Sequence, residues 1–279
     1  MSSNIMPTVT LFDFQQAIAD WAFRKKQAAV FADCGLGKTL IQLDWLRQCG
    51  GGLIVAPLAV AQQTKYEARK LGLECAYVRG QDEIAGPGIY VTNYEMLHAF
   101  DPSLWNAVVL DESSILKSVD GKTRAYLINQ WSKVPNRLCC TATPAPNDMT
   151  EFGNHSEFLG VMPRAQMLAM FFVHDDDGWR LKGHAIEAFY EWLASWAVMF
   201  QLPEQLGFPG DGFRLPPITS EQVTVPIDPA GFAASTGRLF VNGLSGIEGR
   251  LAARRQSLAG RVHKAAQIIQ QSGEPWIVW

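Results

Sequence analysis

Short apolar runs alternate with stretches of helical periodicity through the first half of the chain. Strands that alternate with helices form parallel sheets, because each return connection crosses one face of the sheet. The pattern therefore predicts an α/β fold with a mostly parallel, doubly wound sheet. The run at residues 107–110 is apolar at every position, as expected for a central strand that helices cover on both faces. The predicted strands are Ala28–Phe31, Leu53–Val55, Ile89–Thr92, Ala107–Leu110 and Leu138–Thr141.

The pattern changes after residue 150. Large apolar residues recur at steps of three and four between Ile186 and Phe200, which predicts one helix face and favours a place in the core over base stacking. Pro203–Pro217 is rich in glycine and proline and is typical of a linker. A helix from about Gly249 to Gln271 and a beginning strand at Pro275–Trp279 follow. We expect a first domain at 1–150, a helical, aromatic-rich insertion and linker at 151–217, and a connecting region with the start of a second domain at 218–279.

Composition limits the class of protein. The chain has 279 residues, of which 48% are hydrophobic and 18% charged, so it carries enough apolar material for a packed core and too little charge for wholesale disorder. The net charge of -3 provides no general positive field, and any nucleic-acid contact would need local basic clusters. The sequence shows neither a secretory signal nor an uncharged apolar run of about 18 residues, and its five cysteines lack zinc or redox spacing. These features predict a cytoplasmic protein with reduced thiols and no membrane contact.

The strongest chemical signal is the stretch Ala-Asp-Cys-Gly-Leu-Gly-Lys-Thr at residues 32–39, which follows a predicted strand and opens a predicted helix. Its glycines allow a tight turn whose N–H groups point inward, and the helix N-terminus adds positive potential. In such a loop Lys38 reaches the β- and γ-phosphates of a nucleotide, and the Thr39 hydroxyl binds Mg²⁺. Ala32 stands where the usual pattern has its first glycine. The stretch predicts a site for ATP with Mg²⁺.

Acidic and hydroxyl residues follow two further predicted strands. Asp111 and Glu112 come directly after the strand at 107–110, at the edge where open α/β sheets place their ligand crevice. Asp111 would hold Mg²⁺ through water and Glu112 would orient and deprotonate the attacking water, because phosphoryl transfer depends on positioning and charge neutralisation. Thr141 and Thr143 end the next strand, where their hydroxyls could bond the neighbouring acids or the γ-phosphate region. The predicted catalytic residues are Lys38, Asp111 and Glu112.

Together these motifs resemble those of superfamily 2 helicases, among them the Swi/Snf-type DNA translocases and their phage-encoded, DEAD/DEAH-box-like relatives. The resemblance covers residues 11–147. It implies a RecA-like P-loop NTPase that couples ATP hydrolysis to movement on DNA, with duplex DNA as the preferred partner. Motors of this family also use a second RecA-like domain in the same chain, whose arginine fingers close the site. The sequence ends before those motifs, so the resemblance predicts weak turnover for this chain alone.

The resemblance also assigns roles to single residues. The segment at 11–15 looks like the one whose glutamine recognises adenine, which nominates Gln15. Asp111-Glu112-Ser113-Ser114 looks like the DEAD/DEAH box and departs from it at its last two positions, and residues 141–144 look like the motif that couples hydrolysis to DNA movement. The implied nucleotide-binding residues are Gln15, Gly35, Leu36, Gly37, Lys38 and Thr39, with Thr39 and Asp111 on Mg²⁺; the coupling residues are Thr141 and Thr143; the DNA-contacting residues are Pro57, Leu58, Thr92, Asn93 and Tyr94.

Two other functions share parts of this pattern. A P-loop kinase has the same phosphate loop, but Glu112 directly after Asp111 favours water as the acceptor. A nucleotide-gated DNA-binding or regulatory module without efficient hydrolysis fits the absent second domain and the altered box at Ser113 and Ser114. The sequence leaves translocation and unwinding undecided. We therefore predict an ATP-dependent DNA translocase or helicase, with the regulatory module as the alternative.

Overall fold

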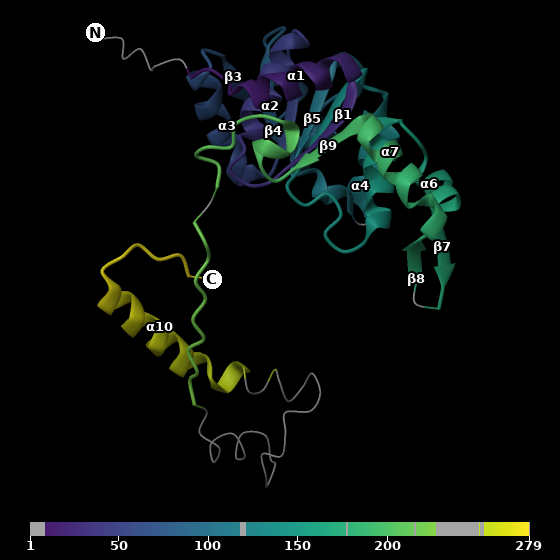
Figure 1. The fold of residues 1–279 in the computed structure, drawn as a ribbon. Coiled ribbons are helices and arrows are strands. Elements are labelled where there is room, and N and C mark those ends of the chain that lie inside the picture. The colour runs from purple at the N-terminus through teal and green to yellow at the C-terminus, as the bar shows by residue number, and fades with distance from the viewer. Residues whose placement is uncertain are drawn as a thin grey trace, which may run out of the picture. The chain divides into compact units, whose positions relative to one another are not determined.

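Seven parallel strands form the central sheet of the computed structural model, within the part of the chain that the structure describes (Figure 1). Their order across the sheet is β3-β4-β2-β5-β6-β1-β9. Each strand that the apolar runs predict is present, and the predicted doubly wound α/β fold is confirmed. The strands are β1 (Gln27–Ala32), β2 (Gly52–Ala56), β3 (Cys75–Tyr77), β4 (Ile89–Asn93), β5 (Ala107–Asp111), β6 (Asn136–Cys140) and β9 (Ala197–Phe200).

The structure describes residues 9–117, 121–176, 178–214, 216–226, 251 and 254–278. The chain divides into two compact units between Leu215 and Pro216. The central sheet and all the candidate site residues belong to the first unit. From sequence, we place the third part of the chain at residue 218 onward, close to this division.

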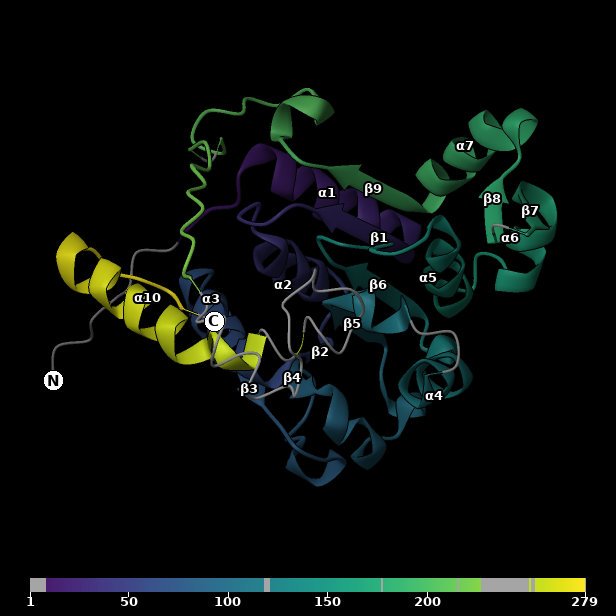
Figure 2. The same ribbon diagram turned by 90° about the horizontal axis from the view of Figure 1, so that it is seen from below.

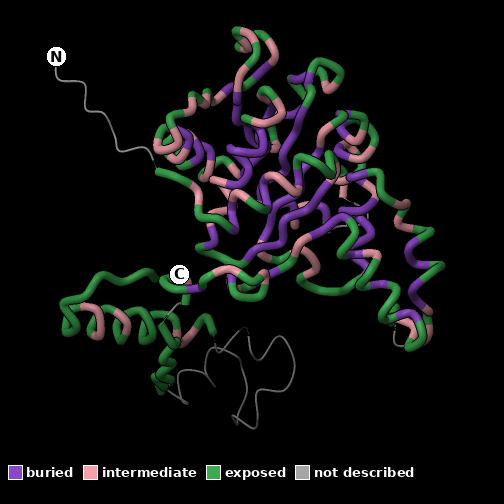
Figure 3. The backbone as a smooth tube through the Cα atoms, turned by 45° about the horizontal axis from the view of Figure 1, so that its top comes forward, coloured by how far each residue is buried: buried purple, intermediate pink, exposed green. Residues whose placement is uncertain are grey.

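Alternate residues along each central strand point to opposite faces of the sheet, and helices cover both faces (Figures 1 and 2). On β1, Ala28 and Val30 join one buried cluster, whereas Ala29 and Phe31 join the other. Figure 3 shows this interior in purple. The first cluster includes residues of α1 (Asp13–Lys25), α2 (Lys38–Gln48) and α3 (Leu58–Lys70), and the second includes residues of α4 (Lys122–Gln130), α5 (Phe152–Leu159), α6 (Arg164–Phe171) and α7 (Ile186–Trp196).

Two strands of the sheet escape the apolar pattern. β3 is three residues long and none of its residues is buried, so its sequence carries no periodic signal. β9 follows α7 directly, and its apolar residues continue the spacing of that helix. The predicted helix therefore ends at Trp196, and Phe200 lies on β9 instead. Because β9 pairs with β1, the sheet includes residues beyond 150, in the stretch that we assign to an insertion from sequence.

The beginning of the predicted linker packs against the first unit. It starts with a 3-10 turn at Pro203–Leu206. The rings of Phe213 and Phe208 lie 5.2 and 6.5 Å from the ring of Phe14 in α1. Phenylalanine side chains leave water when they pack in this way, and this burial holds the segment on α1. Residues 203–213 of the predicted linker therefore belong to the first unit and contact α1.

An antiparallel hairpin connects α6 to α7 (Figure 1). Its strands are β7 (Phe172–Asp175) and β8 (Gly178–Leu181). Arg180 and Asp175 form an ion pair at 2.7 Å across the hairpin. The Lys182 ammonium donates to the carbonyl oxygens of Ala169 and Met170, at 2.8 and 3.1 Å. These bonds satisfy the C-terminal carbonyls of α6 and fix the hairpin to that helix.

Phe189 at the centre of α7 offers a test of the aromatic core. Its side chain is fully buried, and its ring lies 5.5 Å from the rings of both Phe171 and Phe172. Phe189→Ala should lower the free energy of unfolding by about 3–5 kcal/mol, because the truncation leaves a cavity that its neighbours fill only partly. Chemical denaturation measures this change. Glu191→Ala, at an exposed position of the same helix, should change it by less than about 0.5 kcal/mol, and equal losses in the two variants would contradict the core assignment.

In the second unit the structure describes the helix α10 (Leu258–Ser272). The predicted start of this helix, at Gly249, lies outside the described residues. The strand predicted to begin at Pro275 is not formed over residues 275–278. A strand forms only where a neighbouring strand pairs with it. Trp279 lies outside the described residues. The beginning of a second RecA-like domain stays a prediction. Over the described ranges, none of the helices combines the length and apolarity that crossing a bilayer requires.

Candidate active site

The loop between β1 and α2 folds around the Lys38 side chain. The Lys38 ammonium donates to the backbone carbonyl oxygens of Ala32, at 2.9 Å, and Asp33, at 3.2 Å. Ala32 is the last residue of β1 and is fully buried, so this position needs no glycine for the turn. Gly35 and Gly37 make the turn, with φ angles of 83° and 75°. The loop leads directly into the N-terminus of α2, the kind of helix end that binds anions.

Gln15 holds this loop from the side of α1. Its side chain is 2% exposed; Nε2 donates to the carbonyl oxygen of Leu36 at 3.1 Å, and Oε1 accepts from the backbone N–H of Phe12 at 3.0 Å. A Cβ atom at Gly37 would lie 2.3 Å from Gln15 Nε2, so the close packing of this glutamine requires glycine there. Both ends of the Gln15 amide are bonded within the protein, and a role in adenine recognition stays a prediction.

Asp111 is the last residue of β5 and lies directly beside the P-loop helix. Gln42 of α2 donates from Nε2 to Asp111 Oδ1 at 2.7 Å. Burial raises the pKa of the Asp111 carboxyl and the nearby Glu112 charge also raises it, while the bond from Gln42 and the Lys38 ammonium oppose the shift. Lys38 and Asp111 are expected to lie close together at the carboxyl ends of the strands. The hydrogen bond from Gln42, which lies on the same helix as Lys38, joins that helix to Asp111.

Glu112 occupies a strained turn after β5. Its φ is 51°, in the left-handed region, which costs a residue other than glycine about 1–3 kcal/mol. The Thr141 hydroxyl donates to Glu112 Oε2 at 3.2 Å, and the same oxygen, Thr141 Oγ1, accepts from the backbone N–H of Thr143 at 3.1 Å. The structure therefore brings the second acid together with both threonines that follow β6, through one chain of hydrogen bonds.

The oxygen ligands at this edge suit Mg²⁺. Mg²⁺ prefers hydroxyl, carboxylate and water oxygens, which Thr39 and Asp111 can provide together with solvent. Thr39 is the second residue of α2 and is partly exposed. Gln42 Oε1, on the amide that bonds Asp111, is buried and has no hydrogen-bond partner among the described residues. A metal-bound water could satisfy this acceptor, and the residues present fit the ion.

Comparison with solved structures places this arrangement in a known fold. The SWI2/SNF2 ATPase core of Sulfolobus solfataricus in complex with dsDNA matches 72% of this chain and 46% of that chain, with a TM-score of 0.59 and 19% sequence identity. The chain therefore has a RecA-like fold, similar to that of this ATPase core. The helicase domain of Pyrococcus furiosus Hef is matched over 53% of this chain and 36% of that chain, with a TM-score of 0.41 and 17% identity. No family model matches the chain, and no curated protein is significantly similar to it.

The Sulfolobus comparison concerns the fold, and its extent is limited. The chain spans less than half of the length of that ATPase core. The RecA-like sheet is the part that positions Lys38, Asp111 and Glu112: Asp111 ends β5, Glu112 follows it directly, and Lys38 begins α2 after the loop that leaves β1. The predicted RecA-like fold is therefore confirmed, whereas the activity of the chain is a separate question.

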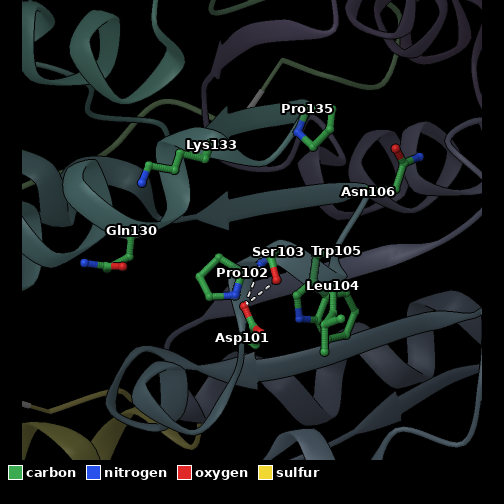
Figure 4. A pocket seen from close by; sticks show the side chains of 9 residues that line it. All are labelled: Asp101, Pro102, Ser103, Leu104, Trp105, Asn106, Gln130, Lys133 and Pro135. Atoms are coloured by element: carbon green, nitrogen blue, oxygen red, sulfur yellow. Dashed lines mark hydrogen bonds between the residues drawn. The ribbon is translucent and has the colours of Figure 1, made fainter.

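A cavity of about 660 Å³ lies away from the candidate site, at the amino ends of the strands of the RecA-like sheet (Figure 4). Its walls come from the residues before β5 and before β6, at the amino ends of these strands. The candidate active site lies at the carboxyl ends, so this cavity is not part of it. The lining residues are Asp101, Pro102, Ser103, Leu104, Trp105, Asn106, Gln130, Lys133 and Pro135.

The residues predicted to contact DNA do not share one surface. Leu58 begins α3 and is 61% exposed beside Pro57, so both can meet a ligand. Thr92 and Asn93 lie on β4 and are buried. The Tyr94 hydroxyl donates to the backbone carbonyl oxygen of Asp111 at 2.7 Å. Thr92 and Asn93 are thus packed in the sheet and the Tyr94 hydroxyl is bonded to the acidic turn of residues 111–113, and contact of these three residues with DNA stays a prediction.

Sequence reasoning missed three hydrogen bonds to the acidic turn, from the side chains of Gln42, Tyr94 and His155. Gln42 follows Lys38 by one helical turn, a spacing that puts both on one side of α2 and could have revealed it. Tyr94 and His155 reach the turn from distant parts of the chain. No local pattern announces such contacts, since they depend on the packing of separate elements.

Proposed function

We propose that the chain binds ATP with Mg²⁺ and hydrolyses it as the ATPase domain of a DNA translocase or helicase. The observation that carries this proposal is the bond between Gln42 of the P-loop helix and Asp111 at the end of β5. It joins the phosphate loop to the acidic turn in one rigid unit. Phosphoryl transfer requires this combination, because a phosphate anchor and a water-activating acid must hold a fixed separation.

Each residue of the site has a distinct task in the proposed reaction. Lys38 exchanges its bonds to the loop carbonyls of Ala32 and Asp33 for bonds to the β- and γ-phosphate oxygens. Glu112 accepts a proton from the attacking water, and the Thr141 hydroxyl orients the Glu112 carboxylate. The N–H groups of the glycine turn stabilise the charge that develops on the phosphates.

Thr39 and Asp111 would hold Mg²⁺ at this site. When bound, the ion neutralises charge on the phosphates and polarises the group that is transferred. A cation beside Asp111 would also favour the ionised carboxylate, whose pKa burial raises. The buried acid and the metal therefore support each other in the proposed site.

The DNA part of the proposal rests on the resemblance of the motifs and on a solved structure of similar fold. The Sulfolobus structure holds dsDNA, and the motifs of the chain resemble those of Swi/Snf-type translocases. On this chain, Pro57 and the exposed Leu58 offer a surface at the start of α3. Tyr94 joins the end of β4 to the carbonyl of Asp111, so a ligand that moves this strand end would also move the acid. A second RecA-like domain in the same chain would complete the motor.

Phosphate release from ATP, measured with and without duplex DNA, tests the proposal. We expect slow, Mg²⁺-dependent hydrolysis that duplex DNA accelerates about tenfold, the size of an ordinary coupling between two sites. The acceleration should decline as salt increases, because phosphate contacts release counterions. Single-stranded DNA of the same length is the control for duplex preference. Hydrolysis that no DNA affects at any salt concentration would contradict the translocase assignment.

The same assay separates the alternatives. A P-loop kinase would form a phosphorylated product with a second acceptor, whereas the proposed ATPase releases only inorganic phosphate. A nucleotide-gated regulatory module would bind ATP and alter its DNA affinity without turnover. Triplex displacement compared with forked-duplex separation decides between translocation and unwinding.

A further inference from the structure

His155 contacts the acidic turn from beneath the sheet. Its Nε2 atom shares a hydrogen bond of 3.1 Å with the hydroxyl of Ser113, the residue directly after Glu112. Both side chains are fully buried. Ser113 begins the 3-10 turn Ser113–Lys117, so it fixes the point at which the chain leaves Glu112. Ser113 is also one of the two positions at which the box departs from the DEAD/DEAH pattern.

The surroundings of His155 keep its ring in one place and one charge state. It lies on α5, and its ring meets the ring of Phe31 on β1 edge to face, at a centroid distance of 5.2 Å. Burial lowers the pKa of His155 to about 4, so the imidazole is neutral at pH 7. A neutral ring that packs on the strand of the phosphate loop can hold a serine hydroxyl without placing a charge beside the acids.

α5 is itself attached to the chain that follows the acidic turn. Asn154 accepts from the Arg124 guanidinium of α4 at 3.0 Å, and its amide donates to the carbonyl oxygen of Lys117 at 3.3 Å. Glu157 forms an ion pair with the same arginine. These bonds hold α5 against Lys117, which ends the 3-10 turn after Glu112, and against Arg124 of α4. The position of His155 relative to Glu112 is therefore set by several contacts.

We propose that His155, through Ser113, is a positioning residue for Glu112 in ATP hydrolysis. The left-handed backbone at Glu112 is strained and would relax if nothing opposed it. The bond to His155 fixes the residue on one side of this turn, while the Thr141 hydroxyl fixes the carboxylate on the other. Together they aim the Glu112 carboxylate at the position of the attacking water. This inference rests on the proposed function.

Ser113→Ala removes the hydroxyl with little change in volume. We expect kcat for ATP hydrolysis by the full chain to decrease about 10- to 100-fold, because a small misplacement of a catalytic group has effects of this size. The KM for ATP should stay within about twofold, because the phosphate loop is unchanged. Ser156→Ala is the matched control. Ser156 is a fully buried serine on the same helix as His155, and its hydroxyl bonds the carbonyl of Met162. It should leave kcat unchanged.

Variants of His155 test the partner in the same way. His155→Leu fills the space without a hydrogen bond and should lower kcat as much as Ser113→Ala. His155→Gln restores an amide near the position of Nε2 and should recover kcat to within about threefold of the unmodified chain, since glutamine can replace this bond. The double variant Ser113→Ala with His155→Leu should be no slower than either single variant, because both remove one interaction.

Two outcomes separate this inference from the proposed function. If Glu112→Gln lowers kcat while Ser113→Ala and His155→Leu retain it, the positioning role is overturned and the ATPase assignment stands. If the unmodified chain shows no hydrolysis that depends on Glu112, the ATPase assignment fails. Amide hydrogen exchange tests the structural part of the inference separately: if the bond to His155 holds the turn, exchange over residues 112–116 should accelerate in Ser113→Ala and not in Ser156→Ala, and unchanged exchange in both refutes it.

Discussion

Lys38→Ala should abolish measurable ATP binding. The Lys38 ammonium is already held at the mouth of the phosphate loop by the carbonyl oxygens of Ala32 and Asp33, so it is placed for a nucleotide without rearrangement of α2. Charge-assisted bonds to phosphate are worth roughly 1.5–3 kcal/mol each, and the loss of two of them weakens binding by at least about 100-fold. Isothermal titration calorimetry with ATP and Mg²⁺ measures the dissociation constant.

Lys133→Ala is the control for this experiment. Lys133 is an exposed lysine at the amino edge of the sheet, where it lines the large cavity away from the site (Figure 4). Its removal changes the net charge by the same amount and should leave ATP affinity within about twofold, because an exposed charge at that distance is screened. If Lys38→Ala retained the affinity of the unmodified chain, the phosphate loop would not be the nucleotide site and the proposed function would fail.

Glu112→Gln should separate binding from hydrolysis. The substitution keeps the size of the side chain and an oxygen for the bond from Thr141, but removes the carboxylate that accepts the proton. Loss of a general base typically lowers the rate by about 10²–10⁴-fold. We expect kcat to decrease by at least about 100-fold. The dissociation constant for ATP should change by less than about threefold. Single-turnover hydrolysis and calorimetry on the same preparation measure both quantities.

Glu95→Gln is a matched control at a neighbouring strand end. Glu95 follows β4, is exposed, and accepts a hydrogen bond from Asn93 at 2.8 Å. It does not contact Glu112, and the rate should be unchanged in this variant. Equal rates for Glu112→Gln and the unmodified chain would favour the regulatory module over the ATPase. A module that only senses nucleotide has no use for a base at residue 112.

The features of the fold that sequence predicts are those with a local signal. The strand at 107–110 is apolar at each position because helices cover it on both faces, and the structure places it at the centre of the sheet. The residues at 75–77 and 197–200 form strands because neighbours pair with them, and their own sequences do not indicate it. Phe200 shows the difficulty, since its spacing fits the preceding helix while its backbone extends along β1.

The candidate site divides in the same way. Asp111 and the phosphate loop could be assigned from sequence because carboxyl ends of parallel strands share one edge. The hydrogen bonds that fix the acidic turn come from Gln42, Tyr94 and His155, which lie on elements whose packing no local pattern reveals. The burial of Thr92 is hidden for a related reason: strand ends look alike in sequence, and only packing shows which side chains face solvent.

The pairing of β1 with β9 also affects how the protein is made. Ala29 lies opposite Ala197, so the strand that carries the phosphate loop waits for a neighbour that the ribosome adds 168 positions later. At about 5–20 residues per second, this delay lasts roughly 8–34 seconds, longer than most small domains need to fold. After β6 has been made and before β9 follows, the loop strand can have β6 on one side and still has an open edge on the other. An emerging chain of this kind is a natural client for chaperones that shield unpaired strands.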